Sequence, residues 1–407
     1  MQETQFLFTY QCDMVMTLTI AAFLLLLGHI IKKQIPVLRR FYIPAPVIGG
    51  IIFSILTLVC HEFGVMSLSF DDQLKNLLMM TFFTSIGFTA SFRMLYHGGI
   101  AVGLFLVCSI ILICIQNFVG ISLAKAFDLN PLIGLATGSI SLTGGHGTSA
   151  AFGPVLEANG LEAGLSVAVA AATFGLVAGS MIGGPLGKRL YNKYQFYIDD
   201  QNISNDDMIK ETKPIDFKQK HAFEHQLFDA ATYLVVCMGI GSLIISGLNR
   251  YNIVLPAYIG PMIVAAVLRN INDMRKVDMP LKAINVIGVL SLQFFLAMAL
   301  MTMRLWELAS LAVPLIVILL TQTVVMGLFA YFITFRIMGK DYDAAVIACG
   351  HCGFGMGATP NAMANMETFT GANGASPKAF FVVPIVGALF IDFVNAISIT
   401  LFMNAMI

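Results

Sequence analysis

The chain has 407 residues, of which 57% are hydrophobic and only 11% are charged. A water-facing shell cannot hide so much apolar surface, so the composition excludes an ordinary soluble protein and predicts a membrane protein. The formal net charge is zero, with 23 basic and 23 acidic residues, and so gives no sign of a nucleic-acid partner. We therefore expect the protein to lie in the lipid bilayer and to have no nucleic-acid partner.

Apolar segments long enough to cross a bilayer recur along the whole chain. The hydrocarbon core is roughly 30 Å thick and needs about 20 helical residues per crossing. Ten segments satisfy this, so we predict an all-α polytopic membrane protein with ten transmembrane helices. They lie near 14–31, 43–60, 77–92, 98–124, 163–187, 227–248, 254–268, 284–303, 308–335 and 379–404.

Two further apolar stretches, near 131–157 and 345–365, are unusually rich in Gly, Ser, Thr and Pro. A continuous helix of this composition facing lipid is not expected, because freed backbone groups find no partner in hydrocarbon. We predict re-entrant or broken segments at both places.

The distribution of Lys and Arg predicts the orientation. With the N-terminus outside, nineteen basic residues face the cytoplasm and four face outward. This bias predicts that both termini are extracytoplasmic, because cytoplasmic loops carry the excess of positive charge. The long hydrophilic stretch at 188–226 is then a cytoplasmic linker. The four outer basic residues are Lys75, Lys125, Arg250 and Arg304.

Local patterns recur between the two halves at a shift of about 211 residues. IPAPVIGG at 43–50 matches LPAYIGPM at 255–262, and GGHGTSAA at 144–151 matches GMGATPNA at 355–362. We predict two repeats, 1–187 and 227–407, each with five spans and one broken segment. Five is odd, so the second repeat enters the membrane inverted, an arrangement typical of secondary transporters.

The first broken segment contains the sequence GSISLTGGHGTSAAF at 138–152. Gly144, Gly145 and Gly147 allow the backbone to leave the helix, so that carbonyl oxygens can ligate a cation. The helix that follows offers free N–H groups and a positive dipole end to an anion. Thr148 or Ser149 is the expected N-cap.

The second broken segment, GHCGFGMGATPNAMANM at 350–366, has the same organisation. Glycines at positions 353, 355 and 357 precede Thr359 as the expected N-cap and Pro360 at the first helical position. Two helix N-termini that approach each other from opposite faces predict a site for carboxylates. The alternative is that these glycines only let helices pack closely.

Asp392 lies in the last apolar segment, far from either end of it. An ionised carboxylate there costs about 2.5 kcal/mol or more, so it needs a sodium ion, a proton or a basic group as partner. Asn395, one turn later, shares its face and offers a second oxygen, and oxygen ligands suit a hard cation. The alternative is a protonated or hydrogen-bonded structural Asp.

Other polar residues within the apolar segments have two interpretations each. His146 and His351 lie inside the broken segments, where they either contact substrate or hold the loop. Mid-membrane amides more often tie helices together than contact substrate. The three amides are Gln116, Gln293 and Gln322.

The sequence Cys349-Gly350-His351-Cys352 has the spacing of a disulfide-exchange motif. That chemistry needs an accessible helix start after a strand, and here the motif lies in an apolar, glycine-rich stretch. A membrane thiol oxidoreductase is therefore a remote alternative.

Four long motifs give the chain a family likeness. SLTGGHGTSAAF, GHCGFGMGATPNAMANM, YIPAPVIGG and QFFLAMALMTMRLWELASLA closely resemble the bacterial sodium/glutamate symporter family. The likeness covers nearly the whole chain except the first dozen residues and the central linker. It implies a transporter and not an enzyme, with L-glutamate as substrate, sodium as coupling ion, a bacterial inner membrane, a homodimer and an elevator-type fold.

The resemblance also implies which residues form the site. By motif position, the glycine-rich runs at 144–149 and 353–361 hold substrate and sodium. Nearest in mechanism is a sodium/proton antiporter with Asp392 as carrier, and a carrier for another dicarboxylate is also open. The expected substrate residues are Gly145, His146, Gly147, Thr148, Ser149, Gly355, Gly357, Ala358, Thr359 and Asn361, and the expected sodium residues are Ser141, Gly144, Gly353, Asp392 and Asn395.

Overall fold

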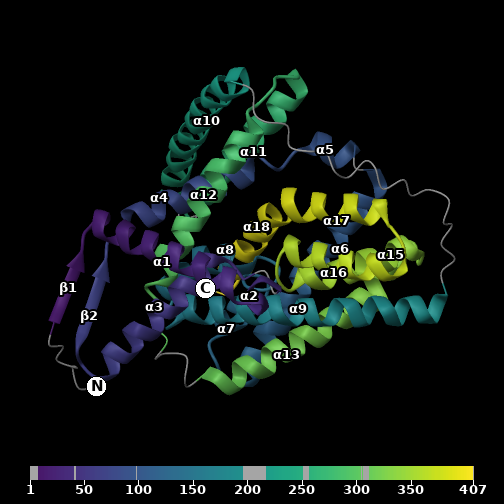
Figure 1. Cartoon of the computed structure of the whole chain (residues 1–407), viewed down its shortest axis with the longest axis horizontal. Coiled ribbons are helices and arrows are strands. Elements are labelled where there is room, and N and C mark those ends of the chain that lie inside the picture. The colour runs from purple at the N-terminus through teal and green to yellow at the C-terminus, as the bar shows by residue number, and fades with distance from the viewer. Residues whose placement is uncertain are drawn as a thin grey trace.

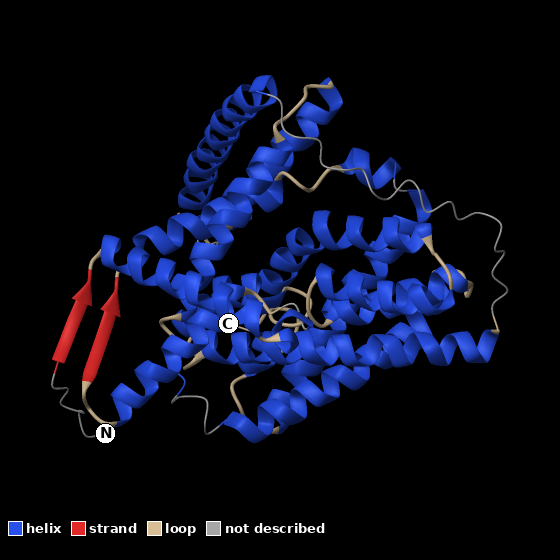
Figure 2. Cartoon of the chain, viewed as in Figure 1, coloured by secondary structure: helices blue, strands red, loops and turns tan. Residues whose placement is uncertain are grey.

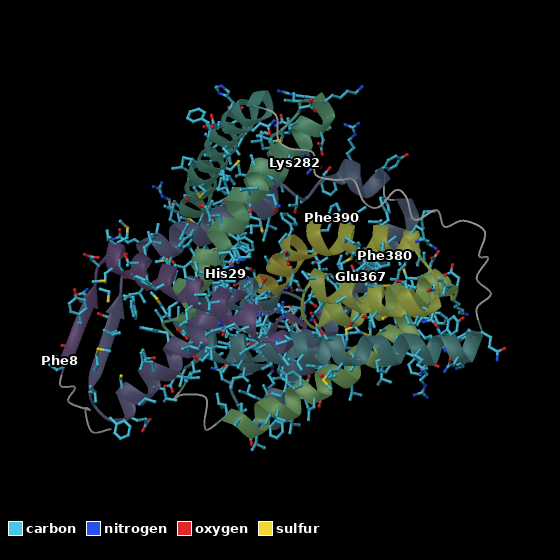
Figure 3. All side chains as sticks on the ribbon, in the orientation of Figure 1. Phe8, His29, Lys282, Glu367, Phe380 and Phe390 are labelled. Carbon is cyan, nitrogen blue, oxygen red and sulfur yellow. The ribbon has the colours of Figure 1, made fainter. Side chains whose placement is uncertain are left out.

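The structure is a computed structural model dominated by helices, with one small sheet (Figure 2). The sheet was not predicted: strands β1 (Phe8–Cys12) and β2 (Met66–Phe70) pair in parallel. Figure 3 shows Phe8 on β1, away from the helical body, and its side chain is 70% exposed. The structure describes residues 8–40, 43–97, 99–195, 217–250, 256–303, 305 and 311–406.

Four helices of the first half begin after a polar residue or proline, namely Asp13, Pro44, Asp72 and Asn130, whereas two others follow Gly144 and Ala163. The Asp13 carboxylate accepts a hydrogen bond from Met16 N at 2.8 Å and so caps the first helix. The helices are α1 (Met14–Gln34), α2 (Pro36–Arg40), α3 (Ala45–Glu62), α4 (Gln73–Gly87), α5 (Phe92–His97), α6 (Gly99–Ala126), α7 (Pro131–Ala136), α8 (Gly145–Ala158) and α9 (Gly164–Tyr194).

The second half repeats this order of long helices and a break. The Asp341 carboxylate caps α15 through Ala344 N at 2.7 Å. The elements are α10 (Phe217–Asn249), α11 (Ile259–Arg275), α12 (Leu281–Leu300), α13 (Ala312–Phe329), the π-helical turn η4 (Ala330–Thr334), α14 (Phe335–Ile337), α15 (Tyr342–Gly355), α16 (Thr359–Asn373), α17 (Pro377–Leu389) and α18 (Ile391–Asn404).

Seven described helices are long and apolar enough to cross a membrane, and a bent pair, α17 with α18, adds an eighth. Two predicted spans, 77–92 and 254–268, correspond to α4 and α11, which have only 15 and 17 residues. The polytopic helical class is confirmed, and the count of ten stays a prediction. The seven are Met14–Gln34, Ala45–Glu62, Gly99–Ala126, Gly164–Tyr194, Glu224–Leu248, Leu281–Leu300 and Ala312–Ile337.

The predicted linker at 188–226 is helical at both ends. Helix α9 runs through to Tyr194, and α10 begins at Phe217. Residues 196–216, the middle of the linker, lie outside the described part of the chain.

The helices pack in two groups (Figure 1), which share a hydrophobic core where they meet. Helices α1, α3, α4, α10, α11 and α12 pack against one another, and we call them the first body. Helices α6, α9, α13, α15, α16 and α17 form the second body, with α7 and α8 packed on α9. Helix α18 contacts both α6 in the second body and α4 and α11 in the first.

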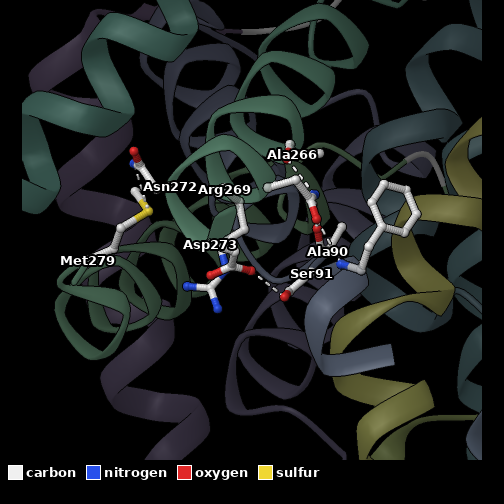
Figure 4. Close-up of polar contacts among 9 residues, drawn as sticks. Ala90, Ser91, Ala266, Arg269, Asn272, Asp273 and Met279 are labelled. Atoms are coloured by element: carbon white, nitrogen blue, oxygen red, sulfur yellow. Dashed lines mark hydrogen bonds and ion pairs between the residues drawn. The ribbon is translucent and has the colours of Figure 1, made fainter. Parts of the chain in front are cut away.

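Polar contacts fix one end of the first body, where the chain leaves α4 (Figure 4). The Ser91 hydroxyl donates to the Asp273 carboxylate, and Arg269 Nε lies 3.2 Å from Asp273 Oδ2. Asn270 Nδ2 donates to Ala90 O at 2.7 Å, and Asn270 Oδ1 accepts from Phe92 N at 2.8 Å. These contacts anchor the start of α5, the connection from the first body to the second.

Candidate functional site

The two glycine-rich segments are both broken, and their breaks touch. Helix α7 ends at Ala136 and α8 begins at Gly145, while α15 ends at Gly355 and α16 begins at Thr359. Gly145 has a φ of +62°, and a Cβ there would lie only 2.8 Å from Gly357 O. The first break therefore needs glycine for both its backbone angle and its contact with the second break.

The helix starts differ from the predicted caps. Gly144 is the N-cap of α8, so Thr148 and Ser149 lie inside the helix. Ala358 is the N-cap of α16, so the prediction of Thr359 as cap was wrong by one residue. Neither helix start has a side-chain cap hydrogen bond. First-turn N–H groups have no partner in the regular α-helical pattern, which leaves those of α8 available to a ligand. In α16 only the Thr359 N–H remains, because Pro360 has no N–H and Asn361 N donates to Ala358 O at 3.0 Å.

A cavity of about 290 Å³ lies where the two breaks meet. Nine of the predicted site residues line it: Gly144, Gly145, His146, Gly147, Thr148, Gly357, Ala358, Thr359 and Asp392.

Polar groups that were predicted as ligands but do not line this cavity are engaged in the surrounding structure. Ser149 Oγ donates to Ala168 O at 3.1 Å, which ties α8 to α9. Asn361 Nδ2 donates to Leu176 O at 2.8 Å, and Asn395 Nδ2 donates to Ser139 O at 2.9 Å. The six predicted residues away from the cavity are Ser141, Ser149, Gly353, Gly355, Asn361 and Asn395.

Asp392 lies in the first turn of α18, directly after a bend of 44° between α17 and α18. Figure 3 shows Phe390 at this bend. The sequence placed Asp392 deep in one continuous span, so the bend is a correction. The start of α18 favours a carboxylate because its dipole end is positive. In the described part of the chain no hydrogen bond or ion pair reaches the Asp392 side chain, which faces the cavity.

The two histidines have different environments. His146 lines the cavity, and its Nε2 lies 2.9 Å from Thr173 Oγ1. His351 lies elsewhere, with Nδ1 2.8 Å from Thr334 Oγ1 and its ring 4.8 Å from the ring of Phe105. His146 can therefore contact a bound solute directly, while His351 joins α15 to the π-helical turn.

Buried amides tie both broken segments to α6. Gln116 Nε2 donates to Gly355 O at 2.6 Å, and Gln116 Oε1 accepts from Thr143 Oγ1 at 2.7 Å. Gln322 Nε2 donates to Gln116 O at 2.7 Å, which adds α13 to the set. These contacts agree with the interpretation of Gln116 and Gln322 as links between helices.

The thiols of Cys349 and Cys352 are fully buried within α15. No aqueous disulfide substrate reaches them there, and α15 follows α14 and not a strand. The geometry is therefore unsuited to thiol exchange.

Apolar residues of the first body close the cavity, and sequence reasoning missed them. Pro44, Phe82, Leu292 and Leu296 come from the chain around α3, from α4 and from α12. Apolar side chains in apolar segments carry no signal of a site, so only the packing of the two bodies reveals them.

The cavity thus has groups that favour an anion and a group that favours a cation. The N-termini of α8 and α16 favour an anion, and the Asp392 carboxylate favours a cation. Among the described residues no three His, Cys, Asp or Glu side chains gather in a metal-binding group. A cation here would therefore rely on Asp392 with hydroxyl, amide or backbone oxygens, the ligand set of a hard ion.

Comparison with known proteins places the chain in a family. The family model described as sodium/glutamate symporter matches residues 10–375. The chain belongs to the sodium/glutamate symporter family. It is 41% identical over 382 residues to the sodium/glutamate symporter of Haemophilus influenzae, covering 93% of this chain and 94% of that protein. It is 40% identical over 400 residues to that of Escherichia coli, covering 97% and 98%.

Proposed function

We propose that this chain carries L-glutamate across a bacterial inner membrane in symport with sodium. The observation that carries the proposal is the convergence of two helix N-termini and the Asp392 carboxylate on one cavity. Membership of the sodium/glutamate symporter family supports it.

The N-termini suit the two carboxylates of glutamate. The backbone N–H groups of Gly145 to Thr148 take one carboxylate, and the Thr359 N–H, at the positive dipole end of α16, takes the other. His146 lies beside the first of these and offers a polar contact to the same solute. The apolar wall of Phe82, Leu292 and Leu296 accommodates the aliphatic carbons.

Coupling follows from charge. Bound glutamate has a net charge of −1, and an ionised Asp392 in the same cavity would repel it strongly in a medium of low dielectric constant. Sodium on Asp392 removes this repulsion, so glutamate binds well only after sodium. Asn395 Oδ1 is buried without a hydrogen-bond partner in the described structure and is available as a further oxygen. The other proposed sodium residues are Ser141, Gly144 and Gly353.

The order of elements supports two inverted repeats of five spans, 1–187 and 227–407, joined by a cytoplasmic linker. In the first half, α6 is followed by the break between α7 and α8 and then by α9. In the second half, α13 is followed by the break between α15 and α16 and then by α17 and α18. Two similar halves in opposite orientations can exchange roles to give inward-open and outward-open states.

The two bodies suggest how the exchange occurs. We propose that the second body, which contains both breaks, slides as an elevator against a homodimeric first body. Smooth apolar contacts suit such sliding, and the cavity wall from the first body is apolar. The excess of basic residues on one side supports extracytoplasmic termini.

The test is counterflow of labelled glutamate into proteoliposomes that contain the purified protein, with and without sodium. We expect accumulation that requires sodium and is competed by unlabelled glutamate. Sodium movement driven by a pH gradient without any amino acid would instead indicate an antiporter. If another unlabelled dicarboxylate competed more strongly than unlabelled glutamate, that dicarboxylate would be the preferred substrate.

Asp392→Asn gives the first specific prediction. Loss of the charged partner of a buried cation costs about 3 kcal/mol or more, so the sodium concentration for half-maximal uptake rises at least about a hundredfold. Initial uptake rates over a sodium titration measure this.

The matched control is Glu367→Gln, the same change on an exposed side chain of α16 away from the cavity (Figure 3). It should leave the sodium titration unchanged. Unaltered sodium activation in Asp392→Asn would remove Asp392 from the ion site.

A further inference from the structure

A second cavity, of about 580 Å³, lies at the far end of the same helices. It is more polar than the first and is not part of the site described above. Its lining comes from α3, β2, α4, α8, α9 and the chain after α12. The lining residues used below are Cys60, Phe70, Asp72, Lys75, Glu157 and Met301.

The two cavities follow one another along shared helices. Helix α4 contributes Phe82 to the first cavity and Lys75 to the second. Likewise, α12 contributes Leu296 to the first, and Met301 directly after it lines the second. Seven residues of helix correspond to a rise of about 10 Å, so the two cavities lie about two helical turns apart along α4.

Lys75 is the unusual group of this second cavity. Its side chain is only 11% exposed, and Nζ lies 2.6 Å from Asp72 Oδ1. Asp72 is itself 60% exposed, so water screens its charge and the pair is weak. A lysine ammonium has three donors, and within the described residues only this contact engages it. A largely buried ammonium so poorly neutralised favours a further anion.

Two carboxylates, those of Asp72 and Glu157, line the cavity together with Lys75. Glu157 Oε1 already accepts from Leu165 N at 3.0 Å. The remaining lining includes Phe70 and Met301, which suit an aliphatic chain. The cavity thus offers an ammonium and two carboxylates beside apolar surface, and these groups match the carboxylate and the ammonium of an amino acid.

We propose that the second cavity is a further binding site for the transported amino acid, with Lys75 Nζ holding one of its carboxylates. The proposal rests on the proposed function. In the orientation proposed above this cavity opens to the outside, so glutamate binds here before it reaches the helix N-termini. Lys75 supplies the positive charge itself, and binding here needs no sodium.

The first test is the kinetics of sodium-driven glutamate uptake by Lys75→Gln in proteoliposomes. We expect KM for glutamate to rise about tenfold, with the maximal rate within about twofold of the unchanged protein. Lys75→Arg keeps the charge and should restore most of the affinity. Lys125→Gln, at an exposed lysine away from both cavities, is the matched control and should change neither constant.

An unchanged KM in Lys75→Gln would overturn the proposal, and so would an equal loss in Lys75→Arg. Absence of sodium-driven uptake in the unchanged protein would instead defeat the proposed function, so the two failures are distinguishable.

A second test uses the native Cys60, which lines this cavity and is partly exposed. Cys114 is the other cysteine that is not buried, and Cys114→Ser removes it. In sodium-free buffer, glutamate should slow the reaction of Cys60 with a water-soluble thiol reagent. Lys75→Gln should abolish this protection. If glutamate did not slow the labelling of Cys60, the result would contradict binding at this cavity. This outcome is read with Lys75 in place, so it holds even if Lys75→Gln lowers transport by misfolding.

Discussion

The two broken segments reach the same cavity by different local structures. The first leaves the helix over residues 137–144 and restarts at Gly145 in a left-handed backbone conformation. The second leaves only over residues 356–358, where Ala358 is extended, and restarts with Pro360 in the first turn. The feature that the halves share is the uncapped helix start in the cavity, and the first depends on a glycine where the second does not.

Gly145→Ala is the strongest test of this difference. A left-handed alanine costs about 1–3 kcal/mol, and its Cβ would lie 2.8 Å from Gly357 O, which forces the two breaks apart. We expect the initial uptake rate to fall at least tenfold while the protein still purifies in a folded form.

Gly160→Ala separates the effect of a strained backbone angle from the effect of a contact between the two breaks. Gly160 also has a positive φ, of +91°, but nothing lies within 4 Å of its added Cβ. It should lose some thermal stability and keep most of its transport rate. Equal losses of transport in both variants would show that contact between the breaks is unimportant.

The sequence predicted the breaks because glycine, serine and threonine have a clear physical meaning inside lipid. It also identified Asp392, because an ionised carboxylate in an apolar segment is costly unless it binds a partner. The bend before Asp392 was not predicted, although Pro384 and Gly387 lie shortly before it and both weaken a helix. Phe82 and Leu292 were missed because they differ in no way from lipid-facing neighbours. Strand β1 was missed because its pairing with β2 depends on a distant segment.

Gln116→Leu tests whether both breaks depend on the same anchor. The change removes the donor to Gly355 O and the acceptor for Thr143 Oγ1. Thr143 Oγ1 lies 3.4 Å from Gly355 O and can turn to it, so the expected destabilisation is about 1–2 kcal/mol. We expect a lower unfolding midpoint in detergent and a transport rate reduced several-fold.

Gln322→Leu is the matched change on the facing helix. Gln322 makes one described hydrogen bond, and its Oε1 is buried without a partner in that part of the structure. The change removes one hydrogen bond, which is a loss, and one buried oxygen without a partner, which is a gain. We therefore expect the free energy of unfolding to stay nearly unchanged. A larger effect in Gln322→Leu than in Gln116→Leu would contradict the assignment of Gln116 as the common anchor.

Gly147→Ala should have the smallest effect, because this glycine serves the cavity and not the break. Its added Cβ would lie 3.4 Å from Leu292 Cδ1 and 3.5 Å from Phe82, which are ordinary contacts, and its backbone is helical. Alanine also favours the helix by about 1 kcal/mol over glycine. We therefore expect unchanged or higher thermal stability with uptake lowered no more than a few-fold, through a tighter contact between α8 and the first body. Uptake rate and unfolding midpoint moving in opposite directions would assign Gly147 to the cavity wall, whereas a joint fall would make it a structural glycine like Gly145.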